Sequence, residues 1–69
     1  MKNHIKVERA KKNLTQEELA KQSGVSRQTI NAIEKDKYFP SVLLALKIAD
    51  IFDVQVNSIF ELESKDWEK

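Results

Sequence analysis

The stretch of the sequence richest in potential chemistry is Ser23–Lys35, which reads SGVSRQTINAIEK. It begins with Gly24, the single glycine of the chain, and a hydroxyl residue, Ser26, which together indicate a tight turn followed by the start of a helix. Ile30 and Ile33 then point to one side of that helix at a spacing of three. Most of the polar side chains lie on the other side, where they form either a solvated helix face or a surface that contacts a specific ligand. The polar side chains in question are Arg27, Gln28, Thr29 and Asn31.

A second helix-start signal lies just before this stretch and predicts the element that positions it. Thr15–Glu18 matches the capping box, in which the Thr15 hydroxyl accepts from the backbone N–H of Glu18 and the Glu18 carboxylate reaches back to Thr15. The helix that begins there is expected to run to about Gln22. It stops before Gly24, because glycine adopts the left-handed conformation that ends many helices.

The remaining segments are also expected to be mostly helical. A basic helix is predicted over about residues 5–12. Ser41 can cap a strongly apolar fourth helix from Val42 to Phe52. Pro40 breaks the chain before it, since the residue preceding a proline is biased away from helix. A short fifth helix is expected from Asn57 to about Leu62. The tail, Glu61 to Lys65, is alternatively a short strand that pairs with the Met1–Ile5 end.

Length and composition restrict the possible classes of protein. Sixty-nine residues allow one domain, with a helical core over about 5–60 and a strand or tail over 61–69. The expected fold class is therefore all-α, five compact helices with an optional two-stranded sheet from the two ends. A chain this small buries only about 60% of its unfolded surface, so oligomerisation is an expected reinforcement. The absence of cysteine excludes disulfides and cysteine-based zinc sites.

Several functions are unsupported by the residues. The chain has a single histidine, His4, and no recognisable carboxylate pair, so the sequence does not predict an enzyme. It also indicates no metal, cofactor or small-molecule effector. No apolar run approaches the roughly 18 residues of a membrane span, and the start lacks the apolar stretch of a signal peptide. The cytoplasm is the expected location. Trp67 is expected on the surface or folded back on the tail, and no function is assigned to it.

The charge of the chain is unevenly distributed. Residues 1–47 carry 10 basic and 5 acidic side chains, whereas residues 48–69 carry 2 basic and 6 acidic ones. One part of the protein could therefore face a polyanion while the other does not. Chance unevenness among solubilising charges explains the same counts, so charge alone does not identify a partner.

Two short helices joined by a glycine-containing turn form a helix-turn-helix candidate, whose second helix would project into a DNA major groove. The residues themselves resemble a known family. LTQEELAKQSGVSRQTINAIEKDKYFPSVLLALKIADIFDVQVNSIF resembles the phage-repressor and Cro-type (XRE-family) helix-turn-helix domain, and VSRQTINAIEKDKY…PS…ALKIA is similar to its small stand-alone regulators. The resemblance covers about Ile5 to Phe60. It implies a compact five-helix domain, usually a homodimer, that binds a palindromic operator and controls transcription.

The resemblance also implies roles for individual residues. The helix after Ser26 would enter the major groove, with base contacts from Arg27, Gln28, Thr29 and Asn31. Arginine suits guanine and glutamine suits adenine, each worth about 1–3 kcal/mol of discrimination. Thr29 and Asn31 are placed for a phosphate or a second base. Arg9 and Glu34 resemble the family's charged pair between the first and third helices, which is architectural.

Contacts to the DNA backbone are implied for a further set of residues, in the second helix and around the recognition helix. For Tyr38, packing within the loop is an equal alternative. The lysines of residues 2–12 are interpreted as solubilising rather than as DNA contacts. The implied phosphate contacts are Gln16, Ser26, Lys35, Lys37, Tyr38 and Ser41.

The apolar surplus of the fourth and fifth helices favours a dimer interface over a core confined to one protomer. The candidates are Ile51, Phe52, Val54, Val56, Ile59 and Phe60. The sequence therefore predicts a sequence-specific DNA-binding regulator, more readily a homodimeric repressor because there is no room for an effector domain. Two alternatives stay open: the antitoxin of a toxin–antitoxin pair that regulates its own operon, and a helical protein-interaction module that does not bind DNA.

Overall fold

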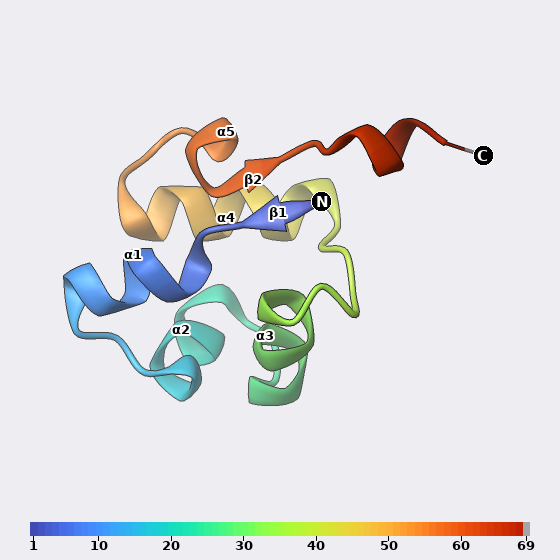
Figure 1. Cartoon of the computed structure of the whole chain (residues 1–69). Coiled ribbons are helices and arrows are strands. Elements are labelled where there is room, and N and C mark those ends of the chain that lie inside the picture. The colour runs from blue at the N-terminus through green and yellow to red at the C-terminus, as the bar shows by residue number, and fades with distance from the viewer. Residues whose placement is uncertain (69) are drawn as a thin grey trace.

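A computed structural model describes residues 1–68 of the chain (Figure 1). Its element order confirms the expected five helices, and the first and fourth have the expected bounds. In Figure 1, α2 and α3 form the lower part of the molecule, and α4, α5 and a small sheet form the upper part. The elements are β1 (Lys2–Asn3), α1 (Ile5–Lys12), α2 (Gln16–Ser23), α3 (Arg27–Glu34), α4 (Val42–Phe52), α5 (Val56–Ile59), β2 (Phe60–Glu61) and a 3₁₀ turn, η1 (Ser64–Trp67).

Three of the helices begin at a hydroxyl side chain, as the sequence predicts. At α2 the full capping box is present: Glu18 N–H donates to Thr15 Oγ1 at 3.0 Å, and Thr15 N–H donates to the Glu18 carboxylate at 2.9 Å. Ser26 accepts from the N–H of Thr29 at 3.2 Å, and Ser41 accepts from that of Leu44 at 3.1 Å. Each hydroxyl satisfies a backbone donor that has no partner within its helix, which fixes where the helix starts.

Residues in the left-handed conformation follow four of the helices. Gly24 ends α2 with a φ of 78°. With only one glycine available, the chain uses Asn13 after α1, Asp36 after α3 and Asp53 after α4, at φ values of 54°, 59° and 56°. Asparagine and aspartate are the non-glycine residues that tolerate this region best, so the helix ends are encoded in the sequence without further glycines.

The core is one cluster to which every helix contributes. Its side chains are nearly all isoleucine, leucine, alanine and phenylalanine, and it lies between the α2–α3 pair and the α4–α5 pair. None of the helices among residues 1–68 has the length and apolar character needed to span a membrane. The core consists of Ile5, Leu19, Ala20, Ile30, Ile33, Leu44, Ile48, Ala49, Phe52 and Ile59.

The two ends of the chain form a short antiparallel sheet, as one of the sequence alternatives predicts. Lys2 pairs with Glu61 and Asn3 with Phe60. The predicted bounds are wrong, however: α5 ends at Ile59 rather than at about Leu62, and the strand is Phe60–Glu61 rather than Glu61–Lys65. The cause is a long-range contact, because the pairing with β1 extends the backbone directly after Ile59, whose carbonyl accepts from the N–H of His4 at 2.9 Å.

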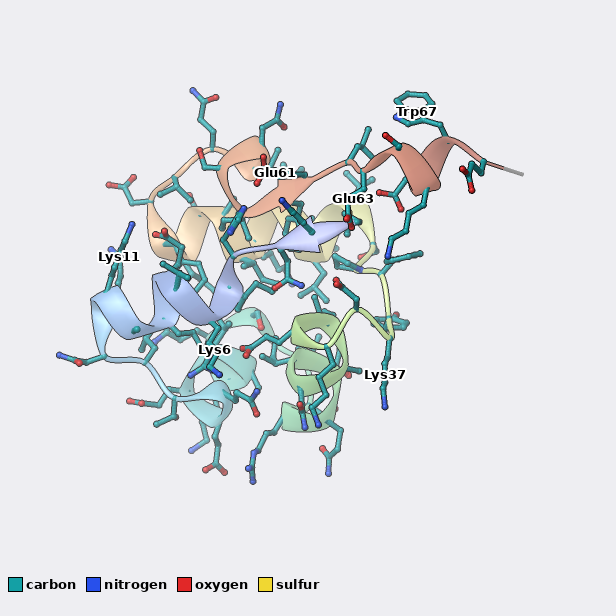
Figure 2. All side chains as sticks on the ribbon, in the orientation of Figure 1. Lys6, Lys11, Lys37, Glu61, Glu63 and Trp67 are labelled. Carbon is teal, nitrogen blue, oxygen red and sulfur yellow. The ribbon has the colours of Figure 1, made fainter. Side chains whose placement is uncertain are left out.

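Beyond the sheet, the tail turns back on the start of the chain. η1 begins with a reciprocal hydrogen-bond pair between Glu63 and Asp66, including a 2.7 Å bond from Glu63 N–H to Asp66. The Met1 ammonium group lies 2.9 Å from the Asp66 carboxylate and 3.2 Å from that of Glu63. The tail is thereby fixed beside the N-terminal end of α4, and Trp67 projects from it into solvent (Figure 2).

Candidate nucleic-acid interface

The helix-turn-helix unit, α2 and α3 with the turn between them, is closely packed. Leu19 and Ile30 are fully buried at the contact of the two helices, and the small side chain of Ala20 is 3% exposed. The turn is tied to α2 by hydrogen bonds from the N–H groups of Gly24 and Val25 to the Ala20 carbonyl, at 2.9 and 3.0 Å. The orientation of α3 relative to α2 is therefore fixed by the fold.

The outward face of α3 carries three of the four predicted base-contacting side chains. Arg27 and Gln28 are exposed and Asn31 is partly exposed, and the three line one shallow pocket at the surface. Neither the Arg27 nor the Gln28 side chain has a hydrogen bond or ion pair with other residues in the described range 1–68. Their donors and acceptors are free for another molecule.

Thr29, the fourth predicted residue, lies apart from the other three. Its hydroxyl is 3.0 Å from that of Ser26, so the two residues together build the start of α3. Thr29 borders a different surface depression between α3 and α4, which we name the α3–α4 hollow. That hollow also contains the predicted phosphate contacts Tyr38 and Ser41, and is lined by Ser23, Gly24, Val25, Thr29, Tyr38, Ser41, Leu43, Leu44 and Lys47.

Lys47 is a member of the α3–α4 hollow that the sequence analysis missed. It is exposed on α4, within reach of the residues expected to contact phosphate. A signal was available, since Lys47 is the only basic residue of α4 and only Asp50 is charged besides it. A charged residue on such a helix must face solvent, but only the fold shows which neighbours it faces.

A second depression, here the α1–α3 hollow, lies on the other side of α3. It brings together the predicted residues Gln16, Asn31 and Lys35 with Lys6, which the sequence analysis interpreted as solubilising. In Figure 2, Lys6 extends from α1 toward α2 and α3, whereas Lys11 extends away from them. The hollow is lined by Asn3, Lys6, Arg9, Gln16, Asn31, Glu34 and Lys35.

The remaining predicted phosphate contacts also lie near α3. Ser26 is exposed at the helix start, with its oxygen accepting from Thr29 N–H. Lys37 is exposed in the loop after α3 and extends toward the lower side of the molecule in Figure 2. Lys6 and Lys37 are well separated there from Glu61 and Glu63, which lie in the upper part. These two lysines and two glutamates, taken from the differently charged parts of the sequence, thus lie in different regions of the surface.

The predicted pair between Arg9 and Glu34 is present in the structure. Nε and Nη2 of Arg9 donate to the two carboxylate oxygens of Glu34 at 2.7 and 3.0 Å, and both side chains are largely buried. Hydrogen bonding to Glu34 raises the pKa of the Arg9 guanidinium above its ordinary value. Arg9 also donates to the Leu14 carbonyl at 3.0 Å, and the Gln16 amide donates to Glu34 at 3.3 Å. One carboxylate of α3 therefore joins both preceding helices.

The expected dimer interface requires a correction. Phe52 and Ile59 are 2% and 0% exposed, so their side chains are buried in the core of a single protomer and cannot contact a partner in this fold. The other four candidates are partly buried and pack against that core: Ile51, Val54, Val56 and Phe60. Counting apolar residues on α4 and α5 did not distinguish core from surface.

Comparison with known proteins gives consistent results for the family. A helix-turn-helix family model matches residues 5–59. An uncharacterized HTH-type transcriptional regulator of Methanocaldococcus jannaschii is 59% identical over 66 residues, which are 96% of this chain and 100% of that protein. A second such regulator, from Bacillus subtilis, is 47% identical over 66 residues, again 96% of this chain and 100% of the relative.

Solved structures with the same fold include two bacterial regulators. The restriction-modification controller protein C.AhdI from Aeromonas hydrophila superposes with a TM-score of 0.75 at 30% identity, covering 81% of this chain and 85% of that one. The N-terminal DNA-binding domain of SinR from Bacillus subtilis superposes with a TM-score of 0.75 at 28% identity, covering 87% and 88%. The family and these neighbours are DNA-binding transcriptional regulators rather than enzymes. The chain therefore belongs to the XRE-type helix-turn-helix family and is an HTH-type transcriptional regulator with a DNA-binding, repressor-like fold.

Proposed function

We propose that this protein is a sequence-specific, homodimeric repressor that acts in the cytoplasm and inserts α3 into the major groove of a palindromic operator. The observation that carries the proposal is the pocket of Arg27, Gln28 and Asn31 on the outward face of α3. On either side of α3, the α1–α3 and α3–α4 hollows supply basic and hydroxyl side chains. A central base-reading surface flanked by phosphate-binding surfaces is the arrangement that a helix in a major groove requires.

Base reading is assigned to the three side chains of that pocket. The Arg27 guanidinium has the fork of donors that matches O6 and N7 of guanine, and the Gln28 amide matches N6 and N7 of adenine. Asn31 is one turn further along the helix and has the same donor–acceptor pair as glutamine. Because Arg27 and Gln28 are exposed in the first turn of α3, this turn would enter the groove most deeply.

Phosphate binding is assigned to the two hollows. In the α3–α4 hollow, Thr29 is assigned to a phosphate rather than a base, because it lines the same depression as Tyr38 and Ser41. In the α1–α3 hollow, Gln16 at the first position of α2 would add the N–H groups of a helix N-terminus. Ser26 and Lys37 complete the set by position. Lys6 and Lys47 line the two hollows and are proposed as additional phosphate contacts.

Repression is the simplest mode of regulation for this arrangement. A protein bound to a promoter blocks other proteins from that DNA, and it needs no surface other than its DNA-binding one to do so. The alternatives of an antitoxin and of an interaction module both require a partner protein, and stable co-purification with a second small protein would favour the antitoxin. Membership of a helix-turn-helix family favours DNA binding over an interaction module that does not bind DNA.

Selection of bound DNA from a random pool tests the proposal. We expect enrichment of a palindrome whose half-site centres are about 10 base pairs apart, one turn of B-DNA. The same selection with the double variant Arg27→Ala, Gln28→Ala should lose the preference at specific positions while retaining salt-sensitive binding. A wild-type pool with no enriched sequence at any round would exclude sequence-specific regulation.

A further inference from the structure

Six large apolar side chains are exposed on one flank of the molecule, which we name the apolar flank. It extends over the loop before α4, the first half of α4 and the tail after β2, away from the pocket of Arg27, Gln28 and Asn31. In Figure 1 these segments lie toward the right side, where the tail runs beside the N-terminal end of α4. The six are Phe39 (61% exposed), Val42 (77%), Leu43 (65%), Leu46 (52%), Leu62 (64%) and Trp67 (76%).

The members of the apolar flank are continuous rather than scattered. Val42 and Leu46 are four residues apart on α4 and Leu43 is three before Leu46, so they lie on one side of the helix. Phe39 and Leu62, distant in sequence, line the same mainly apolar hollow, together with Met1, Pro40 and Asp66. Trp67 extends the surface along the tail, and Figure 2 shows its ring pointing away from the protein.

The size of the apolar flank decides between chance exposure and an interface. Aromatic side chains present roughly 150–250 Å² each, so six aliphatic and aromatic side chains exposed by half or more offer on the order of 800 Å². The largest apolar patch on an ordinary monomer is about 300–600 Å². A standard protein–protein interface takes about 800 Å² from each partner. The apolar flank therefore has the area of one side of a complete interface.

We propose that the apolar flank binds the same surface of a second copy of this chain, forming a two-fold symmetric dimer. The inference rests on the proposed function in taking the DNA-bound protein to be a dimer. It places the interface elsewhere than the six residues expected on α4 and α5, of which Phe52 and Ile59 are buried. A two-fold contact buries the same patch on both copies, so one patch of this area is sufficient. Association also supplies the additional apolar burial that a chain of this length lacks.

The position of the apolar flank suits binding to DNA by the dimer. Leu43 borders the α3–α4 hollow, so the interface would lie directly beside one of the phosphate-binding surfaces without covering the base-reading pocket. In Figure 1 the flank is lateral, and α3 lies in the lower part of the molecule. An axis along the flank thus leaves α3 of both copies on the same side, as successive major grooves require.

Sedimentation equilibrium of the wild-type chain and two matched glutamate variants tests the interface. Leu46→Glu places a charge in the apolar flank, whereas Val7→Glu places one at a similarly exposed apolar residue of α1 (52% and 53% exposed). We expect a wild-type dimer, an unchanged dimer for Val7→Glu, and a dimer affinity lowered roughly 100-fold for Leu46→Glu. A wild-type monomer at about 100 μM, or a Leu46→Glu dimer as tight as that of Val7→Glu, overturns the proposal.

Trp67 gives a second measurement on unmodified protein, because it is the only tryptophan of the chain. On dilution, its emission maximum should shift to longer wavelength over the same concentration range in which the dimer dissociates. In Leu46→Glu it should be at the longer wavelength throughout. A dimer whose Trp67 emission equals that of the monomer contradicts the assignment of the interface to the apolar flank. Circular dichroism of Leu46→Glu checks that its helices are intact.

Binding to a single half-site of the operator tests the proposed dimer interface separately from the proposed DNA-binding function. Leu46→Glu should bind a half-site as well as Val7→Glu does, but should lose the tighter binding to the full palindrome. If wild-type protein binds half-sites and stays monomeric, the apolar-flank dimer is wrong and the DNA-binding proposal stands. If the dimer forms as described and no DNA is bound specifically, the proposed function is wrong and the dimer stands.

Discussion

Arg9 of α1 and Glu34 of α3 are joined by two roughly parallel hydrogen bonds of 2.7 and 3.0 Å, and the Gln16 amide of α2 donates to the same carboxylate. A single buried side chain at the end of α3 thereby fixes this helix to both of the helices that precede it. The pair lies in the α1–α3 hollow, next to the residues proposed to bind phosphate. Its effect on DNA binding is expected to be indirect, through the position of α3.

Replacing Arg9 with alanine should destabilise the protein markedly. Glu34 has only 8% of its side chain exposed and would lose its cation while staying buried. Removing one partner of a buried pair costs about 3–5 kcal/mol, and the lower end applies because the Arg9 side chain is 16% exposed. Urea unfolding measures the loss. Lys11→Ala is the control. The Lys11 side chain is 66% exposed, so its ion pair with Glu8 should contribute no more than about 1 kcal/mol.

Alanine at Arg27 or at Gln28 should reduce specificity with little effect on stability. Each change removes discrimination of about 1–3 kcal/mol at one base pair, while the exposed side chains contribute little to the fold. Affinities for the selected operator and for single-base variants of it measure the first effect, and thermal unfolding measures the second. Gln22→Ala, at an exposed glutamine of α2, is the matched control. A large drop in melting temperature at Arg27 or Gln28 would show that these residues are structural.

The lysines of the two hollows should contribute to the salt dependence of DNA binding. Neutralising Lys6 or Lys47 with glutamine should lower the slope of log affinity against log salt by about 0.9 each, the release expected for one phosphate contact. Lys11→Gln should leave the slope unchanged, because Lys11 extends away from α2 and α3. Equal slopes for all three variants and the wild type would remove Lys6 and Lys47 from the interface.

Gly24 should tolerate asparagine better than alanine. Its φ of 78° lies in the left-handed region, and a Cβ atom there would meet no other atom within 4 Å. The penalty is therefore one of backbone conformation alone, about 1–2 kcal/mol for a residue with a Cβ. Asparagine, which already occupies this region at position 13, should lose less. Unfolding free energies of Gly24→Ala and Gly24→Asn provide the comparison, and equal losses would contradict it.

Acid should weaken the fold partly through the start of α2. Hydrogen bonds from the backbone and hydroxyl of Thr15 lower the pKa of Glu18 below its ordinary 4.5. The unfolded chain therefore takes up this proton first, so the stabilisation is complete above about pH 4.5 and is lost as the pH falls through the lower, folded pKa. Glu18→Gln should lessen the decline in stability between pH 6 and 3, in urea unfolding followed at each pH. An unchanged decline would assign the acid sensitivity elsewhere.

Local signals in the sequence were sufficient to place most helices. Thr15, Ser26 and Ser41 each cap a helix through a contact within three residues, so their effect is visible in the sequence alone. The pair of Arg9 and Glu34 spans 25 residues and was predicted only through the family resemblance. Of the residues proposed to read bases, Arg27, Gln28 and Asn31 line one pocket on the outward face of α3, whereas Thr29 lines the α3–α4 hollow.

The features that could not be predicted from the sequence depend on contacts between segments distant in the chain. The end of α5 is set by the pairing of Phe60 with Asn3, and η1 is set by the Glu63–Asp66 pair beside Met1. The burial of Phe52 and Ile59 likewise depends on how α4 and α5 pack, because an apolar helix shows no polar side from which its orientation could be read. Lys6 and Lys47 belong to hollows that exist only once α1, α3 and α4 are assembled.

The side chains of Arg27 and Gln28 make no hydrogen bonds or ion pairs with the rest of residues 1–68, whereas the caps, the left-handed residues and the core that hold α3 in place are all at other positions. The choice of operator is in this sense separable from the fold. If Arg27 and Gln28 read bases as proposed, substitution at these two positions should change which bases are bound while leaving the scaffold intact, so that regulators with different targets can diverge by a few exchanges on the first turn of α3. Such a protein can acquire a new regulatory target without passing through an unstable intermediate.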